Sequence, residues 1–394
     1  NPGEGFNLRR DVYLRVANTV RQLREKGFDF VLVLPPWGNC WHFDFVLVLP
    51  PWGNCWHWRT KPRQTKIRWS ELFDLDSLSD FVPVIEFDEF LEGGQGTSVS
   101  TVGTSVSTVL YLQHYAEGWA DGEYTLKYDI RPCIEADKYY AKRGDKWNNG
   151  HFFDYADLHA KDLQCLSIQG QSSTLAEAIA QSILSRSLMV DSILSRSLMV
   201  DRAETILHDQ FGDHFFWKAR KSMRYAKRLR SIGDTFRADQ LANTSDYLCA
   251  HLRRADFVWA HREEIPSIEG AAAQIAQNIA QNASKLDISD VFLSTDATPS
   301  EVNIGESFGE TKCPMVKFSD ENEQMELSGA AISIIDQWIC ANSRFFIGTH
   351  LSTFSFRIHE DREILGHDAR TTFNRFCPDN VSDCEQPAKW TIVN

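Results

Sequence analysis

The sequence predicts an α/β protein of two Rossmann-like domains that face each other across a cleft. Its 394 residues are enough for two separate hydrophobic cores. The N-terminal part has a loop–helix–strand order, and the C-terminal part alternates short apolar runs with segments of helical periodicity. We place the N-terminal domain, with an acceptor-side cleft, at residues 1–200 and the C-terminal domain at residues 201–394.

The N-terminal domain begins with a glycine-containing loop that opens onto a helix. Apolar residues at helical spacing predict a helix over residues 8–25, with five arginines on its other faces, and Gly27 ends it. The apolar run at residues 30–34 then predicts a buried parallel strand. A helix N-terminus that follows a loop containing Gly3 and Gly5 favours an anion, because its amides and dipole point there.

The C-terminal domain alternates strands and helices. Residues 202–240 are predicted to be helical, and four arginines there form a solvated basic face: Arg220, Arg224, Arg228 and Arg230. The strands are predicted at residues 247–252, 291–293, 315–318 and 345–347, and the helices at residues 268–285, at residues 328–342 and from about Ser352 onward. This order predicts a parallel sheet with helices on both faces.

The most informative segment is His251-Leu252-Arg253-Arg254-Ala255-Asp256-Phe257, at the end of the first of these strands. His251 and Arg253 alternate along the strand end and point the same way, so we assign both to a ligand. Arginine suits a diphosphate because its planar cation donates several hydrogen bonds. Arg254 is assigned to structure, pointing toward Asp256. The alternative is an ion pair between either arginine and Asp256.

Two further segments of this domain carry candidate ligand contacts. Asp336 lies on an otherwise apolar predicted helix, where a carboxylate needs a partner. The two neighbouring donors of a guanine base would suit it, and a buried ion pair or a backbone hydrogen bond is the alternative. Ser352 and Thr353 are expected to cap the last helix, and a phosphate could use the same hydroxyls and amides.

In the N-terminal loop, Glu4 stands between two glycines, which allow the backbone to approach a ligand closely. A carboxylate there could act as a general base on a hydroxyl group. The alternative is a solvated acid. Two Rossmann-like domains with these groups suit a transferase that uses a nucleotide sugar.

Composition restricts the partners. The formal net charge of −13 argues against nucleic acid or an anionic membrane as the main partner. No apolar run is long enough to span a bilayer, and no cysteine or histidine cluster has the spacing of a zinc site. We therefore expect no nucleic acid, no membrane span and no metal.

Cysteines and glycosylation triplets favour the secretory pathway. Cys377 and Cys384 are expected to form a disulfide in a polar tail, Cys133 and Cys165 could form a second one, and Cys340 is expected to be a buried free thiol. Three triplets match the N-glycosylation pattern, at Asn243, Asn282 and Asn380.

Four perfect tandem duplications interrupt the chain. The copies occupy residues 28–42 and 43–57, 96–102 and 103–109, 182–191 and 192–201, and 275–278 and 279–282. True repeat proteins have drifted copies at one sustained period. We interpret these duplications as artefacts or as an unusual chain, and we place no site residue in them.

Many segments together resemble the GDP-fucose protein O-fucosyltransferases, and in particular the branch that acts on thrombospondin type 1 repeats. They include NPGEGFNLRRDVYLR, VLPPWG, YAEGW, CLSIQG, HLRRADF, STDA, IIDQWICA, STFSFRIHE and CEQPAKW. The departures are the duplications and His350-Leu351. The resemblance implies a GT-B-like fold, the endoplasmic-reticulum lumen, and inverting transfer without a metal or other cofactor, with GDP-fucose as donor and GDP as product.

The resemblance also implies roles for single residues. Glu4 would be the base, and Arg253 would assist catalysis. The contacts to GDP-fucose would be Gly5, Asn7, His251, Arg253, Asp336, Ser352, Thr353 and Phe354. Cys133 would pair with Cys165, and Cys377 with Cys384.

Three other functions stay open. The chain could act on EGF repeats, as the sister enzymes do, or it could be a non-catalytic, chaperone-like binder of cysteine-rich repeats. It could also use another sugar nucleotide. For the preferred function, the partners are folded proteins with thrombospondin type 1 repeats, and the chain is expected to be a monomer.

Overall fold

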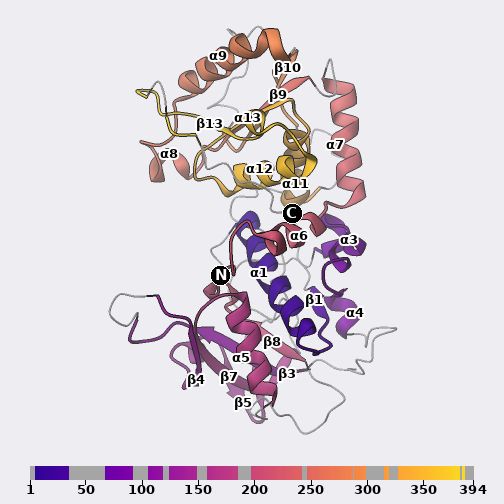
Figure 1. The fold of residues 1–394 in the computed structure, drawn as a ribbon, viewed down its shortest axis with the longest axis vertical. Coiled ribbons are helices and arrows are strands. Elements are labelled where there is room, and N and C mark those ends of the chain that lie inside the picture. Colours follow the sequence, from indigo (N-terminus) through magenta and orange to yellow (C-terminus); the bar gives the residue numbers. More distant parts are fainter. Residues whose placement is uncertain are drawn as a thin grey trace. The chain divides into compact units, whose positions relative to one another are not determined.

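A computed structural model of the chain describes residues 5–34, 67–91, 105–118, 124–148, 158–184, 197–241, 246–286, 288–298, 315–318, 327–381 and 384–386. The chain divides into two compact units (Figure 1). Unit 1 comprises residues 1–226 with residues 393–394, and unit 2 comprises residues 227–392. The boundary between the units therefore follows Ala226, whereas the sequence placed it after residue 200.

Among its described residues, unit 1 begins with a long helix and contains two sheets. Its helices are α1 (Phe6–Glu25), α2 (Trp69–Leu72), α3 (Leu75–Ser79), α4 (Phe87–Leu91), α5 (Ser172–Leu184) and α6 (His214–Ser222), with short 3₁₀ turns η2 (Ala136–Lys138) and η3 (Ala203–Thr205). Its strands are β1 (Leu32–Leu34), β2 (Val84–Glu86), β3 (Ser105–Gln113), β4 (Lys127–Arg131), β5 (Ala141–Arg143), β6 (Lys146–Asn148), β7 (His159–Gln169) and β8 (Leu198–Asp201).

The larger sheet of unit 1 is mixed. Strand β3 lies between β7 and β8 and pairs parallel with both, whereas β4 and β6 pair antiparallel with β7. Two of the duplicated blocks reach this sheet, because β3 begins and β8 ends inside second copies. The predicted strand at residues 30–34 is β1, which pairs parallel with β2 in a separate two-stranded sheet.

Helix α1 confirms the predicted helix and its end at Gly27, which adopts a positive φ of 88°. The arginines that the sequence places on the other faces of this helix are not all exposed, because Arg10 is fully buried. Its guanidinium donates to the hydroxyl oxygen of Tyr225 over 3.1 Å and lies over the rings of Phe6 and Phe73. The helix packs against α5 and α6, so more than one of its faces is covered.

Unit 2 is built on one parallel sheet, as the sequence predicted. Its strands are β9 (Tyr247–Leu252), β10 (Asp290–Thr295), β11 (Met315–Val316), β12 (Phe345–Gly348) and β13 (Asn374–Arg375). Its helices are α7 (Lys227–Gln240), α8 (Phe257–Ala260), α9 (Ile268–Leu286), α11 (Gly329–Ala341), α12 (Thr353–Leu365) and α13 (Ala369–Thr372). The strand order is β11-β10-β9-β12-β13, and all four pairings are parallel.

The two faces of β9 separate by the period-two rule of a strand. Leu248, Ala250 and Leu252 share a hydrophobic cluster with Ala271 and Ile275 of α9. The alternate residues face the other side of the sheet, where Cys249 is bonded to Cys340 of α11 and His251 lies against Phe354 of α12. Helices therefore cover both faces of this sheet, as predicted.

Three disulfides are present among the described residues. Cys133–Cys165 and Cys377–Cys384 confirm the predicted pairs. Cys340 is buried but is not a free thiol, because it is bonded to Cys249 with the two Cα atoms 5.1 Å apart. The reason is that β9 directs Cys249 toward the face of the sheet that α11 covers.

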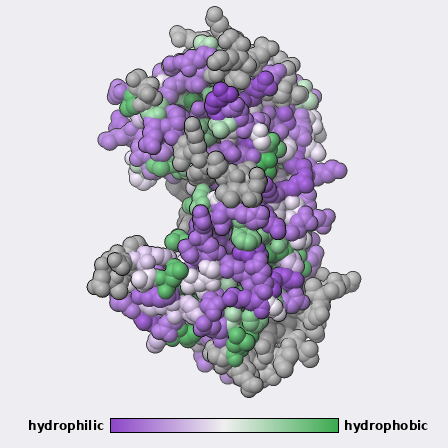
Figure 2. Space-filling view, viewed as in Figure 1, coloured by the Kyte–Doolittle hydropathy of each residue, from purple (hydrophilic) through white to green (hydrophobic). Residues whose placement is uncertain are grey.

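The predicted basic face in residues 202–240 was also wrong in part. Arg220 is only 1% exposed and lies on α6 of unit 1, whereas Arg228 and Arg230 lie on α7 of unit 2. Hydrophilic side chains cover most of the described surface on the face shown in Figure 2, where hydrophobic residues form only scattered groups. Among the described residues, no helix combines the length and the apolar character that crossing a membrane requires.

Candidate functional site

The candidate site of unit 2 lies at the carboxyl ends of β9, β10 and β12. Parallel α/β sheets bind ligands at this edge, because loops and helix N-termini converge there. The register brings His251 of β9 opposite Ser294 of β10 and opposite Gly348 of β12. Three segments that are far apart in the sequence therefore supply neighbouring groups.

His251 is a neutral imidazole held between two elements. Its side chain is 4% exposed, its Nδ1 atom lies 2.7 Å from the hydroxyl oxygen of Ser355, and its ring stacks on Phe354 with 4.4 Å between the centroids. Burial, with a smaller contribution from the cation of Arg253, lowers the pKa of His251 to about 3. It can therefore donate and accept hydrogen bonds without carrying charge at neutral pH.

Arg253 is held by two carboxylates. Its guanidinium donates to Asp256 over 2.6 Å and also to Asp296, which follows β10. The expectation that Arg254 points toward Asp256 was wrong: the guanidinium of Arg254 donates to the backbone carbonyl of Pro266 over 3.0 Å. Its amide donates to Asp296 over 2.6 Å, so this one carboxylate fixes both arginines. Arg254 is not paired with Asp256 because Asp256 pairs with the guanidinium of Arg253, as Asp296 does.

The loop after β12 connects this edge to α12. Thr349 is the junction, because its hydroxyl donates to the carbonyl of His251 and accepts from the amide of Arg253, both over 2.9 Å. Gly348 allows the close approach, since a Cβ atom there would lie 2.6 Å from the hydroxyl oxygen of Ser355. Leu351 has a φ of 61°, a conformation that non-glycine residues rarely adopt.

Helix α12 starts where the sequence predicted. Ser352 occupies the N-cap position and is 4% exposed, but its side chain makes no capping hydrogen bond to the described helix. The expectation that this hydroxyl caps the helix was therefore wrong. Thr353 is the first residue of the helix and Phe354 the second. The first amides of a helix have no partner within it, so this end remains suited to an anion.

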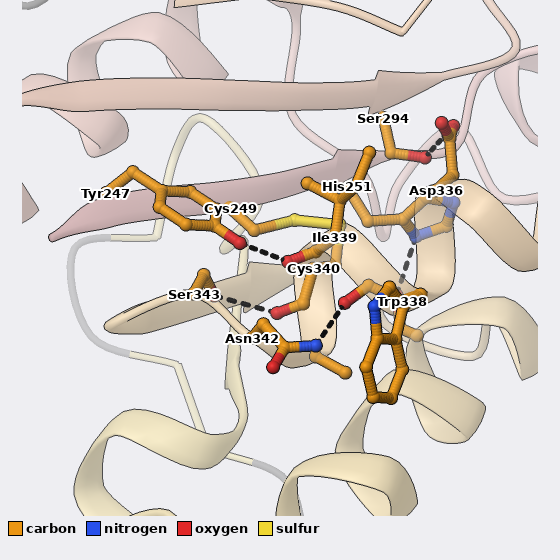
Figure 3. The surroundings of a disulfide bond; sticks show 12 residues. Tyr247, Cys249, His251, Ser294, Asp336, Trp338, Ile339, Cys340, Asn342 and Ser343 are labelled. Carbon is orange, nitrogen blue, oxygen red and sulfur yellow. Dashed lines mark hydrogen bonds between the residues drawn. A yellow bond between two sulfur atoms is a disulfide. The ribbon is translucent and has the colours of Figure 1, made fainter. Parts of the chain in front are cut away.

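Asp336 lies on α11 behind this edge. One carboxylate oxygen accepts a hydrogen bond of 2.7 Å from Ser294, as Figure 3 shows. The other oxygen, Oδ1, is buried and has no hydrogen-bond partner among the described residues. Burial raises the pKa of Asp336 to about 7, against smaller opposing effects of Ser294 and Lys317. A buried acceptor without a partner is costly, so its presence points to a ligand donor.

The remaining predicted residues belong to unit 1. Gly5 is the N-cap of α1, and Asn7 lies in the first turn of that helix with 9% of its surface exposed. Glu4 lies outside the described residues. The structure thus groups His251, Arg253 and the start of α12 in unit 2, and Gly5 and Asn7 belong to unit 1.

Several residues of the site were not singled out from the sequence. Ser294 and Asp296 follow the apolar run of β10, and a polar residue directly after a buried strand was the available signal. Ser355 lies two residues beyond Thr353 and has no distinctive pattern. Thr349 stands beside a glycine at a strand end, which is a position that often carries ligand contacts.

The described residues contain no group of three or more histidine, cysteine, aspartate or glutamate side chains that could hold a metal ion. The charged groups of the unit 2 site are a cationic fork and carboxylates, and its uncharged groups are an imidazole and hydroxyls. This combination suits an anionic ligand that also carries hydrogen-bond donors.

Comparison with known proteins identifies the family. The family described as GDP-fucose protein O-fucosyltransferase matches residues 1–365. Two curated proteins named GDP-fucose protein O-fucosyltransferase 2, from Caenorhabditis elegans and Homo sapiens, are each 41% identical over 420 residues, covering 100% of this chain and 88% of theirs.

A solved structure supports the fold. The crystal structure of POFUT1 in complex with GDP-fucose is similar with a TM-score of 0.58 and 15% identity, covering 95% of this chain and 96% of that one. At this identity the similarity concerns the fold alone, which is α/β and GT-B-like, as predicted. By sequence and by fold, the chain belongs to the GDP-fucose protein O-fucosyltransferase family of glycosyltransferases.

Proposed function

We propose that this chain transfers fucose from GDP-fucose to a serine or threonine hydroxyl of a folded thrombospondin type 1 repeat, with inversion and without a metal. Membership of the family supports O-fucosyl transfer to protein. The observation in unit 2 that carries the donor assignment is Asp336, whose buried Oδ1 has no partner among the described residues.

The guanine base is the donor group that fits Asp336. Guanine presents a ring N–H and an exocyclic amine side by side, and a carboxylate can accept from both. Ser294 occupies only Oδ2. When guanine donates to the carboxylate it supplies hydrogen bonds to the charged form, which offsets the burial that raises the pKa of Asp336.

The diphosphate is assigned to Arg253 and to the start of α12. Asp256 and Asp296 hold the guanidinium of Arg253 at the edge of the sheet, so little reorganisation is needed when the phosphates bind. The hydroxyls of Ser352 and Thr353 and the first amides of α12 offer further donors. His251, neutral and stacked on Phe354, adds a hydrogen bond without adding charge.

The transfer is a single displacement. The acceptor oxygen forms a bond to the anomeric carbon of fucose from the face opposite GDP, while the bond from that carbon to the β-phosphate oxygen breaks and its electron pair leaves with GDP. Arg253 stabilises the negative charge that grows on this leaving group. Glu4 removes the hydroxyl proton as general base. We assign Gly5 and Asn7 to donor contacts beside it.

The acceptor class rests on two supports. The segments quoted above resemble the branch that acts on thrombospondin repeats, and the curated relatives at 41% identity are named as enzyme 2 of the family. The POFUT1 structure is only 15% identical, so it concerns the fold and does not bear on the acceptor class. The three disulfides are compatible with a lumenal, oxidising compartment, and we propose the endoplasmic reticulum.

A transfer assay tests this function. Purified chain and GDP-fucose are incubated with a folded thrombospondin repeat or a folded EGF repeat, and the acceptor mass is measured. A deoxyhexose on the thrombospondin repeat alone is the expected result. Addition to the EGF repeat alone would assign the chain to the sister activity, and binding of GDP and repeat without transfer would indicate a non-catalytic binder.

Two further readings of the same assay test the finer claims. Transfer is expected to persist in a strong chelator, because no step of the displacement needs a metal. The anomeric configuration of the product, determined by NMR, is expected to be inverted relative to GDP-fucose. A retained configuration would reject the single displacement, and loss of activity in chelator that a divalent ion restores would reject metal independence.

A further inference from the structure

The third disulfide lies directly behind the proposed guanine contact. Cys249 precedes His251 by two residues on the same face of β9, and Cys340 follows Asp336 by one turn on the same face of α11. Both cysteines are fully buried. Figure 3 shows the bond between β9 and α11, next to His251 and Asp336.

Among the described residues, the bond lies along β9 between two hydrogen bonds that also connect α11 to the sheet. At one end the hydroxyl of Tyr247 donates to the carbonyl of Ile339. At the other end Ser294, which is opposite His251 in the register, donates to Asp336. Along β9 these connections are two residues, about 6.6 Å, apart, and along α11 Cys340 is one turn, about 5.4 Å, from Asp336. The disulfide is therefore one helical turn from the carboxylate.

This placement opposes the natural tendency of Asp336. A buried carboxylate is more stable in water, and a helix that could tilt or slide would move it outward. The hydrogen bond from Ser294 is exchangeable, whereas the link from Cys249 to Cys340 is covalent and keeps their Cα atoms, which are 5.1 Å apart, within the short range that a disulfide allows. We propose that the Cys249–Cys340 disulfide is a positioning element that holds Asp336 in register with β9 and thereby determines the selectivity for guanine.

This inference rests on the proposed donor site. It predicts an effect on base selectivity that a disulfide with a purely stabilising role would not have. A bond that only stabilises the fold changes the folded fraction, but each folded molecule keeps its relative affinities. A positioning bond changes the ratio of affinities for two bases. Inosine diphosphate is the suitable probe, because it lacks only the exocyclic amine of GDP and so removes one of the two donors to Asp336.

The experiment compares five proteins by isothermal titration with GDP and with inosine diphosphate. They are the wild-type chain, Asp336→Asn, the double variant C377A/C384A, which removes another disulfide of unit 2, and two link-free variants that lack the Cys249–Cys340 bond. The link-free variants are C249A/C340A and C249V/C340A, and the second restores most of the removed volume in case the first folds poorly. Circular dichroism confirms folding of each.

In the wild-type chain one hydrogen bond to a charged group should favour GDP over inosine diphosphate by about 10- to 100-fold. The ratio should fall to within about threefold of unity in Asp336→Asn and in the link-free variants, and it should stay unchanged in C377A/C384A. A wild-type ratio near unity, or an unchanged ratio in Asp336→Asn, would reject the guanine assignment itself.

The positioning role fails under a different outcome. If Asp336→Asn loses selectivity while a folded link-free variant keeps the wild-type ratio, the disulfide does not position the carboxylate. Failure of both link-free variants to fold would likewise assign the bond to stability and overturn the inference.

Discussion

Replacing Asp336 with asparagine should make the ligand-free protein more stable and the nucleotide complex weaker. One of its carboxylate oxygens, Oδ1, is buried and has no partner among the described residues. Its pKa rises from 3.8 to about 7. Each unit of pKa shift corresponds to roughly 1.4 kcal/mol, so the ionised carboxylate costs the folded state about 4 kcal/mol. Asparagine keeps the shape and carries no charge.

The sign of the pH dependence follows from the direction of the shift. Because the folded-state pKa is above the unfolded-state value, the folded chain binds this proton more tightly. The cost is absent below about pH 4, grows as the pH rises from about 4 to 7, and is complete near pH 8. Asp336→Asn should therefore match the wild type in acid and exceed it by up to about 4 kcal/mol near pH 8.

The same substitution should weaken GDP binding. Asparagine offers an amide donor toward the two donors of guanine, so at least one favourable contact is lost, and we expect the dissociation constant to rise about 100-fold. In the wild-type chain, binding needs the ionised carboxylate, so affinity should fall up to tenfold for each pH unit below about 7. The variant should lack this dependence.

Urea unfolding of both proteins between about pH 5 and pH 8, with GDP titrations at the same pH values, measures all three effects. A variant that is less stable than the wild type near pH 8 would show that Asp336 is satisfied in the free protein. Unchanged GDP affinity would show that the carboxylate does not bind the guanine base. Either result would reject the assignment of Asp336 as an unsatisfied carboxylate that binds guanine.

Three other substitutions test the surroundings of this site. Gly348→Ala should lower the free energy of unfolding by about 1–3 kcal/mol in urea, because the new Cβ would meet the hydroxyl of Ser355 at 2.6 Å; an unchanged midpoint would contradict that crowding. Leu351→Gly should raise the free energy of unfolding by about 1 kcal/mol, since Leu351 is 42% exposed and has a positive φ, and a lower midpoint would show that its side chain matters more than its backbone. Arg253→Ala should lower kcat of fucose transfer by about 100-fold or more, measured with saturating GDP-fucose, whereas an effect on KM alone would limit Arg253 to binding.

The sequence predicts the parts of unit 2 that depend on local pattern. The apolar run before His251 and the alternation of strands with helices predicted the parallel sheet, and the polar residues at the strand ends predicted where the candidate site lies. These features can be predicted from the sequence because a buried parallel strand needs a continuous apolar run and its carboxyl end must be followed by a loop. The Cys377–Cys384 disulfide in the polar tail was also predictable, and Cys133–Cys165 was named as a possible second pair.

The features that depend on tertiary packing were not predictable. Cys249 and Cys340 stand on an apolar strand and an apolar helix, where a cysteine is as acceptable as alanine, so nothing local shows that they meet. Arg10 is similar, since a helical pattern does not show that a second layer covers its polar face. One partner of Arg253 is Asp296, which follows a strand about forty residues later, so the sequence around Arg253 does not show this pair.

In the proposed mechanism, unit 2 binds the donor and Glu4 removes the proton of the acceptor hydroxyl. The most direct test is Glu4→Ala, with GDP affinity measured by titration and fucose transfer to a thrombospondin repeat measured by acceptor mass on the same preparation. We expect that GDP binds with the wild-type dissociation constant while transfer is lost. Wild-type transfer in this variant would contradict the assignment of the base, and loss of GDP binding would contradict the division of roles.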